Sequence, residues 1–263
     1  MEQPTRIEKA PGHWVLARLG KKVLRPGGVE LTGRMLDRLD IGPDDDVVEF
    51  APGLGATARL TLQRRPRSYV AIERDEAAAE SVRRCLNGTS QRCVVGAAQA
   101  TGLPDACASV VYGEAMLTMQ TPGVKSHVVA EAARLLRDGG RYGIHEIVLA
   151  PETIDPDLAE RVRRELTDAI HHAVLPLTEA GWRELLESCG LRVAHTMQAP
   201  MHLLEPRRLI RDEGVRGAAR FAWNALRDGA ARRRVLAMRR VFRRYQAHLE
   251  AVAIIASKPR QSA

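Results

Sequence analysis

The sequence is poor in the residues that mark several classes of protein. Its four cysteines form no C-x-x-C pair and have no histidine at zinc-finger spacing, so neither a disulfide framework nor a metal site is expected. Aromatic residues make up only 4% of the chain, which disfavours a surface that stacks on nucleic-acid bases. No apolar stretch approaches the roughly 18 residues that a membrane span needs.

The rest of the composition is that of a globular protein. Hydrophobic residues make up 45% and charged residues 27% of the 263 residues, enough for one core with a modest accessory part. The first residues, MEQPTRIEKAPGHW, lack the apolar centre of a signal peptide. We therefore expect a cytoplasmic protein.

The net charge of +8 is concentrated in one segment. Between Pro206 and Tyr245 thirteen arginines face three acidic residues, a net charge of +10, so the remainder carries −2. Here Val235, Met238, Phe242 and Tyr245 recur at helical spacing and predict an amphipathic helix with arginine on its other face. A solvated outer face explains this pattern. Contact with an anionic membrane surface, an acidic partner or an anionic substrate remains an alternative.

Short apolar runs alternate with helical patterns, as in a parallel sheet covered by helices. The runs are near-continuous, as expected for strands buried on both faces. Seven strands are predicted, at residues 45–52, 68–75, 92–98, 108–117, 141–149, 191–200 and 248–259. The helix before the fifth strand should stop at Gly139 and Gly140, and another should run from an N-cap at Thr178 to Gly190.

We expect a single domain with three additions to its core. The core comprises residues 45–200 and 247–259. The additions are an amino-terminal helical lid at 1–44, a helical insertion at 152–177 and an arginine-rich helical cap at 205–246.

The run VVEFAPGLGATA, residues 47–58, breaks from a strand into a glycine turn. Gly53, Gly55 and Ala58 satisfy the spacing G-x-G-x-x-G/A of nucleotide-binding turns. Glu73 follows 20 residues after Gly53, where a carboxylate accepts both ribose hydroxyls and disfavours a 2′-phosphate. No G-x-x-x-x-G-K-[ST] occurs, which excludes a Walker-type phosphate loop.

Two classes of ligand fit this turn, a dinucleotide and an adenosine derivative without phosphates. Glu49 lies inside the strand, four residues before Gly53, and a carboxylate there suits a cationic amino group better than a pyrophosphate. This observation favours the second class. A nicotinamide-dependent oxidoreductase and a non-catalytic cofactor-binding protein remain alternatives.

The passages around this turn resemble the motifs of class I S-adenosylmethionine-dependent methyltransferases. The family motif [DE]-x-G-x-G-x-G reads Glu49 to Gly55 here, with Ala51 in place of the first glycine. YVAIERD, residues 69–75, is similar to the second motif. VVGAAQATGLP, residues 94–104, is similar to the segment after the third strand, with Ala97 in place of an adenine-contacting aspartate.

Three later passages continue the resemblance. RLLRDGGRYGIHEIV and LTEAGWRELLESCGL are similar to the family's fifth strand with its flanking helices, and the last two strands to its antiparallel hairpin. The resemblance implies an α/β, Rossmann-like, doubly wound and mostly parallel seven-stranded sheet that binds S-adenosyl-L-methionine. The cofactor residues it implies are Glu49, Ala51, Pro52, Gly53, Gly55, Glu73, Arg74, Ala97, Ala98, Glu114 and Ala115.

The cofactor class implies transfer by in-line displacement, which depends more on alignment than on acid–base catalysis. His145 and Glu146 fall at the carboxyl end of the fifth strand, where one points to each face, and His172 ends the insertion helix. These three are the catalytic candidates; a core histidine and an exposed helix surface are the alternatives. The residues expected near the acceptor are His13, Trp14, Tyr112 and His171.

YGEAML, residues 112–117, lacks the Asn/Asp-Pro-Pro-Tyr/Phe motif that nucleic-acid and protein amide methyltransferases carry at this point. We therefore expect a small-molecule acceptor, with the accepting atom (O, N, S or C) left open. The arginine-rich cap prompts one alternative, a lipid-like acceptor at a membrane surface.

Overall fold

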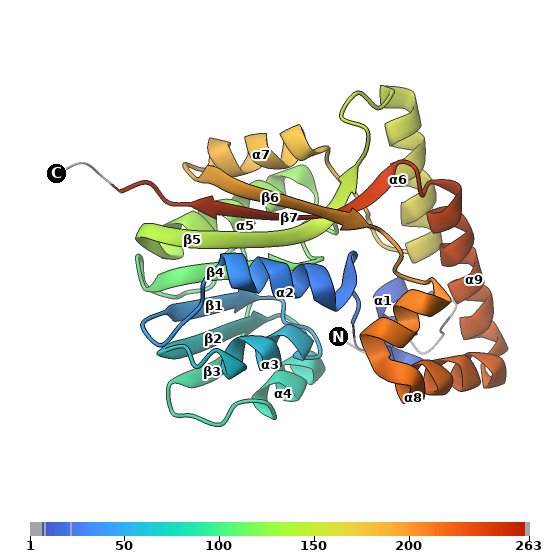
Figure 1. Cartoon of the computed structure of the whole chain (residues 1–263), viewed down its shortest axis with the longest axis horizontal. Helices are drawn as coiled ribbons and strands as arrows, with labels where there is room; N and C mark the ends of the chain where they lie inside the picture. Colours follow the sequence, from blue (N-terminus) through green and yellow to red (C-terminus); the bar gives the residue numbers. More distant parts are fainter. Residues whose placement is uncertain (1–6, 8, 22, 261–263) are drawn as a thin grey trace.

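A seven-stranded sheet forms the centre of the molecule (Figure 1). The computed structural model describes residues 7, 9–21 and 23–260, so residues 1–6, 8 and 22 of the predicted lid lie outside the described part. The strands are β1 Asp46–Phe50, β2 Ser68–Glu73, β3 Gln91–Val95, β4 Ala108–Glu114, β5 Leu136–Leu149, β6 Arg192–Pro200 and β7 Leu249–Ser257.

The strand order is β3-β2-β1-β4-β5-β7-β6. The five strands β1 to β5 run parallel, and β7 is antiparallel to both β5 and β6. The predicted fold class, with its carboxyl-terminal antiparallel hairpin, is confirmed.

Helices cover both faces of the sheet. On one face Val47 of β1 packs in a cluster with Leu31 and Ala58, and on the other Val48 packs in a cluster with Val128 and Leu186. Adjacent residues of one strand therefore belong to different cores, which explains the near-continuous apolar runs. The helices of the first face are α2 Gly28–Arg38, α3 Ala56–Gln63 and α4 Glu76–Arg83, and those of the second are α5 Pro122–Leu135 and α7 Glu179–Ser188.

A helical cap stands beyond the carboxyl ends of strands β1 to β6 (Figure 1). The chain enters one cap helix from the end of β5 and another from the end of β6, and these two ends share one edge because β7 opposes both strands. Leu16, Val162, Phe221 and Met238 join the cap helices in a third hydrophobic cluster. The cap helices are α1 Gly12–Arg18, α6 Pro156–Ile170, α8 Pro206–Arg227 and α9 Gly229–Arg244.

The junction of α5 and β5 differs from the prediction. The helix ends at Leu135 and not at the two glycines, and β5 already begins at Leu136. Gly139 donates its N–H to the carbonyl of Lys258, and Lys258 donates to Gly140. Both glycines thus extend the strand because they pair with the residue that follows β7. The predicted cap of α7 is confirmed, since the Thr178 hydroxyl accepts from the N–H of Gly181.

Among the described residues, no helix is long and apolar enough to cross a membrane.

Trp182 and Trp223 provide a matched test of the core. Trp182 is fully buried and donates its indole N–H to the carbonyl of Ile147 at 3.0 Å, whereas Trp223 is 59% exposed. We expect Trp182→Ala to lower the free energy of unfolding by about 3–5 kcal/mol, and Trp223→Ala to change it by less than about 0.5 kcal/mol. Urea unfolding followed by circular dichroism measures both. Equal losses in the two variants would contradict this packing.

Candidate active site

The glycine turn leaves β1 at the carboxyl edge of the sheet. Three of its residues have positive φ, namely Ala51 at 49°, Gly53 at 55° and Gly55 at 74°. Ala51 therefore keeps the left-handed conformation that glycine adopts freely, at a cost of about 1–2 kcal/mol. The alanine at this position therefore does not prevent the left-handed conformation. At Gly55 a Cβ would lie 3.3 Å from Cys85 Sγ, so this position is also closely packed.

Glu73 ends β2 beside this turn and is held rigidly. Its carboxylate accepts N–H groups from Gly53 at 2.9 Å, Arg74 at 2.8 Å and Asp75 at 3.0 Å. The loop after β3 also comes close, since Gly96 donates its N–H to the carbonyl of Glu73 at 3.0 Å. The predicted positions Ala97 and Ala98 follow directly on that loop. These N–H groups fill three of the roughly four acceptor positions of the carboxylate, so a pair of ribose hydroxyls would share the capacity that is left.

Glu49 lies beneath the turn in the core. It accepts hydroxyl hydrogen bonds from Tyr69 and, at 2.7 Å, from Tyr112. Burial raises the pKa of Glu49 to about 7, although both tyrosine hydroxyls oppose the shift. Tyr112 is fully buried, and its oxygen also lies 2.7 Å from that of Thr61. The expectation that Tyr112 faces an acceptor is therefore not met, because its ring fills the core below the turn.

Glu114, at the end of β4, is held by four side chains from different parts of the fold. Its side chain is only 7% exposed, and it accepts hydroxyl hydrogen bonds from Thr32 of α2 and Thr57 of α3. Arg25 Nη1 lies 3.4 Å away and His145 Nδ1 lies 2.8 Å away. Burial alone would raise the pKa of Glu114, but Arg25 and then His145 outweigh it and lower the pKa to about 2.

The ionised state of Glu114 determines which ring nitrogen of His145 carries the hydrogen. A carboxylate only accepts hydrogen bonds, so His145 Nδ1 must carry the hydrogen that lies between them. In the neutral ring Nε2 then holds a lone pair. His145 is fully buried, and its Nε2 has no hydrogen-bond partner within the described chain.

Arg25 is a site residue that sequence reasoning missed. It belongs to the passage RPGG before α2 and is only 7% exposed. Its Nη1 pairs with Glu114, but its buried Nε and Nη2 have no hydrogen-bond partner in the part of the chain described. Two unpaired buried donors are costly, so this position suits an anionic group of a ligand.

Glu146 points to the opposite face from His145, as the strand alternation predicts. Its carboxylate accepts the N–H groups of Met116, Leu117 and Thr118 at 2.8–3.0 Å and the Thr118 hydroxyl at 2.6 Å. Burial raises the pKa of Glu146 despite these four donors. Its surroundings thus favour a positioning role, in which it holds the loop that follows β4. Ala115 begins this loop with a φ of 52° and donates its N–H to the carbonyl of His145 at 2.7 Å.

Two of the predicted acceptor-site residues, His13 and Trp14, gather near Arg74 together with the catalytic candidate His172. The ring of His13 lies 5.4 Å from that of Trp14 and 6.3 Å from that of His172, measured between centroids. Burial lowers the pKa of His13 to about 4, and the charges of His172 and Arg74 add to this shift. Helix α1 and the carboxyl end of α6 therefore meet beside the end of β2.

His171 does not join this group, since its Nδ1 lies 2.8 Å from Arg234 Nη1 of α9. Arg234 is buried, and it also donates to the carbonyl of Ala169. It is an exception to the prediction that arginine fills the outer face of α9.

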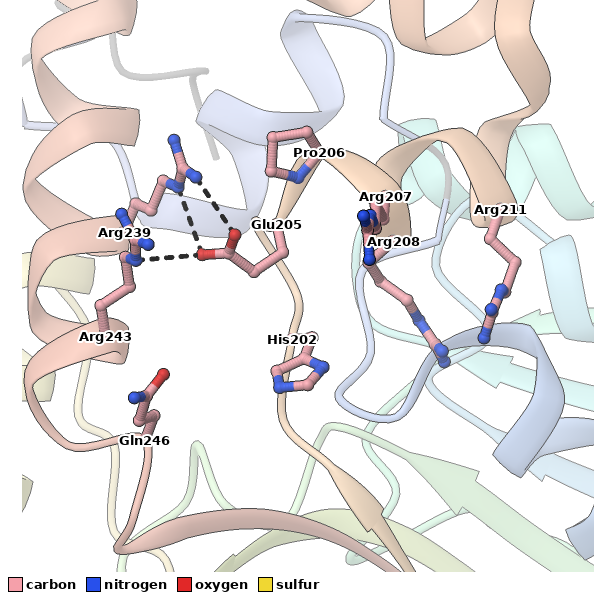
Figure 2. A pocket seen from close by; sticks show the side chains of 9 residues that line it. All are labelled: His202, Glu205, Pro206, Arg207, Arg208, Arg211, Arg239, Arg243 and Gln246. Carbon is pink, nitrogen blue, oxygen red and sulfur yellow. Dashed lines mark hydrogen bonds and ion pairs between the residues drawn. The ribbon is translucent and has the colours of Figure 1, made fainter.

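A cavity lies within the cap. Its volume is about 680 Å³, and it opens between α8 and α9 (Figure 2). Glu205 stands in its middle and pairs with Arg239 at 3.1 Å and Arg243 at 3.4 Å. Its lining residues are His202, Glu205, Pro206, Arg207, Arg208, Arg211, Arg239, Arg243 and Gln246. As for metals, no cluster of three or more histidine, cysteine or acidic residues occurs within the described ranges.

Known proteins similar to this chain indicate its family. A family model described as "Methyltransferase domain" matches residues 48–144. An uncharacterized protein of Haemophilus influenzae is 32% identical over 220 residues, which cover 82% of this chain and 86% of that protein. The chain belongs to the class I S-adenosylmethionine-dependent methyltransferases.

Solved structures share the fold at low sequence identity. The phosphoethanolamine N-methyltransferase 2 of Haemonchus contortus, bound to phosphomonomethylethanolamine and S-adenosylhomocysteine, is 11% identical with a TM-score of 0.71, covering 98% of this chain and 59% of that one. The [4+2]-cyclase SpnF is 13% identical with a TM-score of 0.71, covering 94% and 93%. Because the same fold occurs in a methyltransferase and in a cyclase, the fold alone does not determine the reaction, which depends on the residues of the site.

The raised pKa of Glu49 predicts a dependence of stability on pH. Unfolding returns the carboxyl from a pKa of about 7 to its ordinary value of 4.5. Between these values the folded state keeps a proton that the unfolded state has released. The free energy of unfolding therefore falls as the pH rises through this window, by about 3 kcal/mol.

Glu49→Gln removes this titration, so the variant should gain stability relative to wild type between pH 5 and pH 7.5. Urea unfolding at both pH values measures the gain, and Glu76→Gln, at an exposed position of α4, is the matched control. If wild type and Glu49→Gln respond to pH in parallel, Glu49 does not carry a raised pKa.

Proposed function

We propose that the protein transfers a methyl group from S-adenosyl-L-methionine to a small-molecule acceptor. The observation that carries this proposal is the placement of two side chains around the glycine turn that follows β1: Glu73 is a fixed carboxylate at the end of β2, and Arg25 is a buried guanidinium beside Glu114 at the end of β4. A ribose and an amino-acid carboxylate are the groups that these two side chains would hold. The cytoplasmic location predicted from the sequence remains a prediction.

The residues present fit this cofactor. When bound, it supplies a methyl group made electrophilic by a sulfonium. Glu73 would accept the ribose hydroxyls, and the unpartnered Nε and Nη2 of Arg25 would donate to the carboxylate of the methionine part. Glu114 would attract its amino group, because a pKa of about 2 keeps this side chain ionised. The turn from Ala51 to Gly55 and the loops at Ala97 and Ala115 would supply backbone contacts.

His145 is proposed as the general base for acceptors that must lose a proton. Glu114 holds Nδ1 at 2.8 Å and so directs the Nε2 lone pair away from itself. Glu146 would act indirectly, as a positioning residue for the loop at 116–118. His13, Trp14 and His172 are proposed to border the acceptor, because they gather beside Arg74 at the end of β2.

Binding of S-adenosylhomocysteine tests the assignment of the cofactor. We expect Glu73→Ala to weaken binding about 10- to 100-fold, because two hydrogen bonds to a charged acceptor are lost. Glu76→Ala, three residues further on at an exposed position, should bind as wild type. Isothermal titration calorimetry with S-adenosylhomocysteine and, separately, with NADH measures both classes of ligand. Heat from NADH alone would reject the proposal in favour of an oxidoreductase.

The role of His145 is tested by separating binding from rate. A screen of small molecules with methyl-labelled cofactor first identifies an acceptor. His145→Gln should then lower kcat about 100-fold, as loss of a general base does, and leave the affinity for S-adenosylhomocysteine within about threefold. An unchanged kcat on an acceptor that must lose a proton would show that His145 is only a core residue.

A further inference from the structure

The exposed apolar side chains of this protein are gathered in one place. Six large hydrophobic residues are exposed among those described, and five of them lie on α8 and α9. The same two helices carry all thirteen arginines of the basic segment. The five are Ile210, Val215, Trp223, Leu226 and Leu236.

On α8 these residues form a stripe that faces away from the core. Val215, Trp223 and Leu226 are 73%, 59% and 63% exposed. Their spacing of i, i+8 and i+11 places all three within about 80° of helix rotation. Ala218 and Phe221, on another side of the helix, already fill the cap core. The helix therefore has two apolar faces, and folding buries only one of them.

Arginines border this stripe. Arg216, Arg220 and Arg227 are exposed next to it, and the guanidinium of Arg227 lies 5.9 Å from the ring centroid of Trp223. On α9, Leu236 is 50% exposed between the exposed residues Arg232 and Arg240. Apolar anchors flanked by arginine are the pattern of helices that lie in the headgroup region of a bilayer.

We propose that the outer face of α8 and α9 docks on an anionic lipid bilayer. The apolar stripe would enter the boundary of headgroups and acyl chains, and the arginines would contact lipid phosphates. The net charge of +10 favours this occupant over a second copy of the chain, since a symmetric dimer would oppose two such segments. The proposal rests on these two helices and does not depend on methyl transfer.

The cap lies at the same edge of the sheet as the candidate active site. Both helices stand beyond the carboxyl ends of β5 and β6, which is the edge that carries Glu114 and His145 (Figure 1). A bilayer on the outer face of the cap would therefore lie at the same end of the molecule as the candidate active site.

Vesicle co-sedimentation tests the docking directly, with the full chain and no cofactor. At about 0.1 M salt we expect wild type to bind vesicles of phosphatidylglycerol and phosphatidylcholine, and to bind pure phosphatidylcholine at least about tenfold more weakly. Binding to the anionic vesicles should weaken as salt rises to about 0.5 M, because screening shortens the reach of the arginines. No binding to anionic vesicles, or equal binding to both compositions, would overturn the proposal.

Two double variants separate the contributions of the apolar stripe and of the arginines to vesicle binding. Trp223→Ser with Leu226→Ser should weaken binding at least about tenfold, and Arg216→Gln with Arg227→Gln should weaken binding and reduce its salt dependence. Val95→Ser is the matched control and should bind as wild type, because Val95 is the one exposed large hydrophobic residue outside the cap in the described part of the chain. Circular dichroism and S-adenosylhomocysteine binding show whether each variant is folded.

Two further results would contradict the proposal. Equal losses in Val95→Ser and the stripe variant would show that the stripe is not a specific contact. If light scattering instead finds a dimer that Trp223→Ser with Leu226→Ser dissociates, and vesicle binding stays unchanged in that variant, the stripe is an interface between copies of the chain.

Discussion

The site depends on one buried negative charge. Glu114 binds the segment before α2 through Arg25, α2 through Thr32, α3 through Thr57 and β5 through His145. A carboxylate that is only 7% exposed cannot remain ionised without such partners. The same contacts orient the imidazole of His145 and bring the Arg25 guanidinium to the carboxyl edge. Glu114 therefore both joins the elements around the site and positions the two groups, Arg25 and His145, that are proposed to act there.

Much of the fold follows from local sequence, and the reasons are physical. Near-continuous apolar runs predict a parallel sheet, and Thr178 with Gly190 marks both ends of α7, because these signals act within a few residues. The α5–β5 junction was predicted wrongly, because Gly139 pairs with Lys258, more than a hundred residues away. Local pattern cannot detect such a partner.

The candidate site, too, was only partly predictable from local sequence. Glu73 lies beside the glycine turn as its spacing from Gly53 predicts, whereas Arg25 and Thr32 carry no local motif and are brought to Glu114 only by the fold. Strand alternation predicts that His145 and Glu146 face opposite sides. It does not predict which of them meets the Thr118 loop. The buried face of α9 was predicted from helical spacing, but the outward stripe of α8 becomes evident only once burial is known.

We propose that this carboxyl edge holds S-adenosyl-L-methionine between Glu73 and Arg25. A crystal structure with S-adenosylhomocysteine tests it most directly, because each contact can be measured. We expect ribose hydroxyls within about 3 Å of the Glu73 carboxylate and the ligand's carboxylate at the same distance from Arg25. Density for the ligand elsewhere, or a ligand that leaves both side chains without contact, would contradict it.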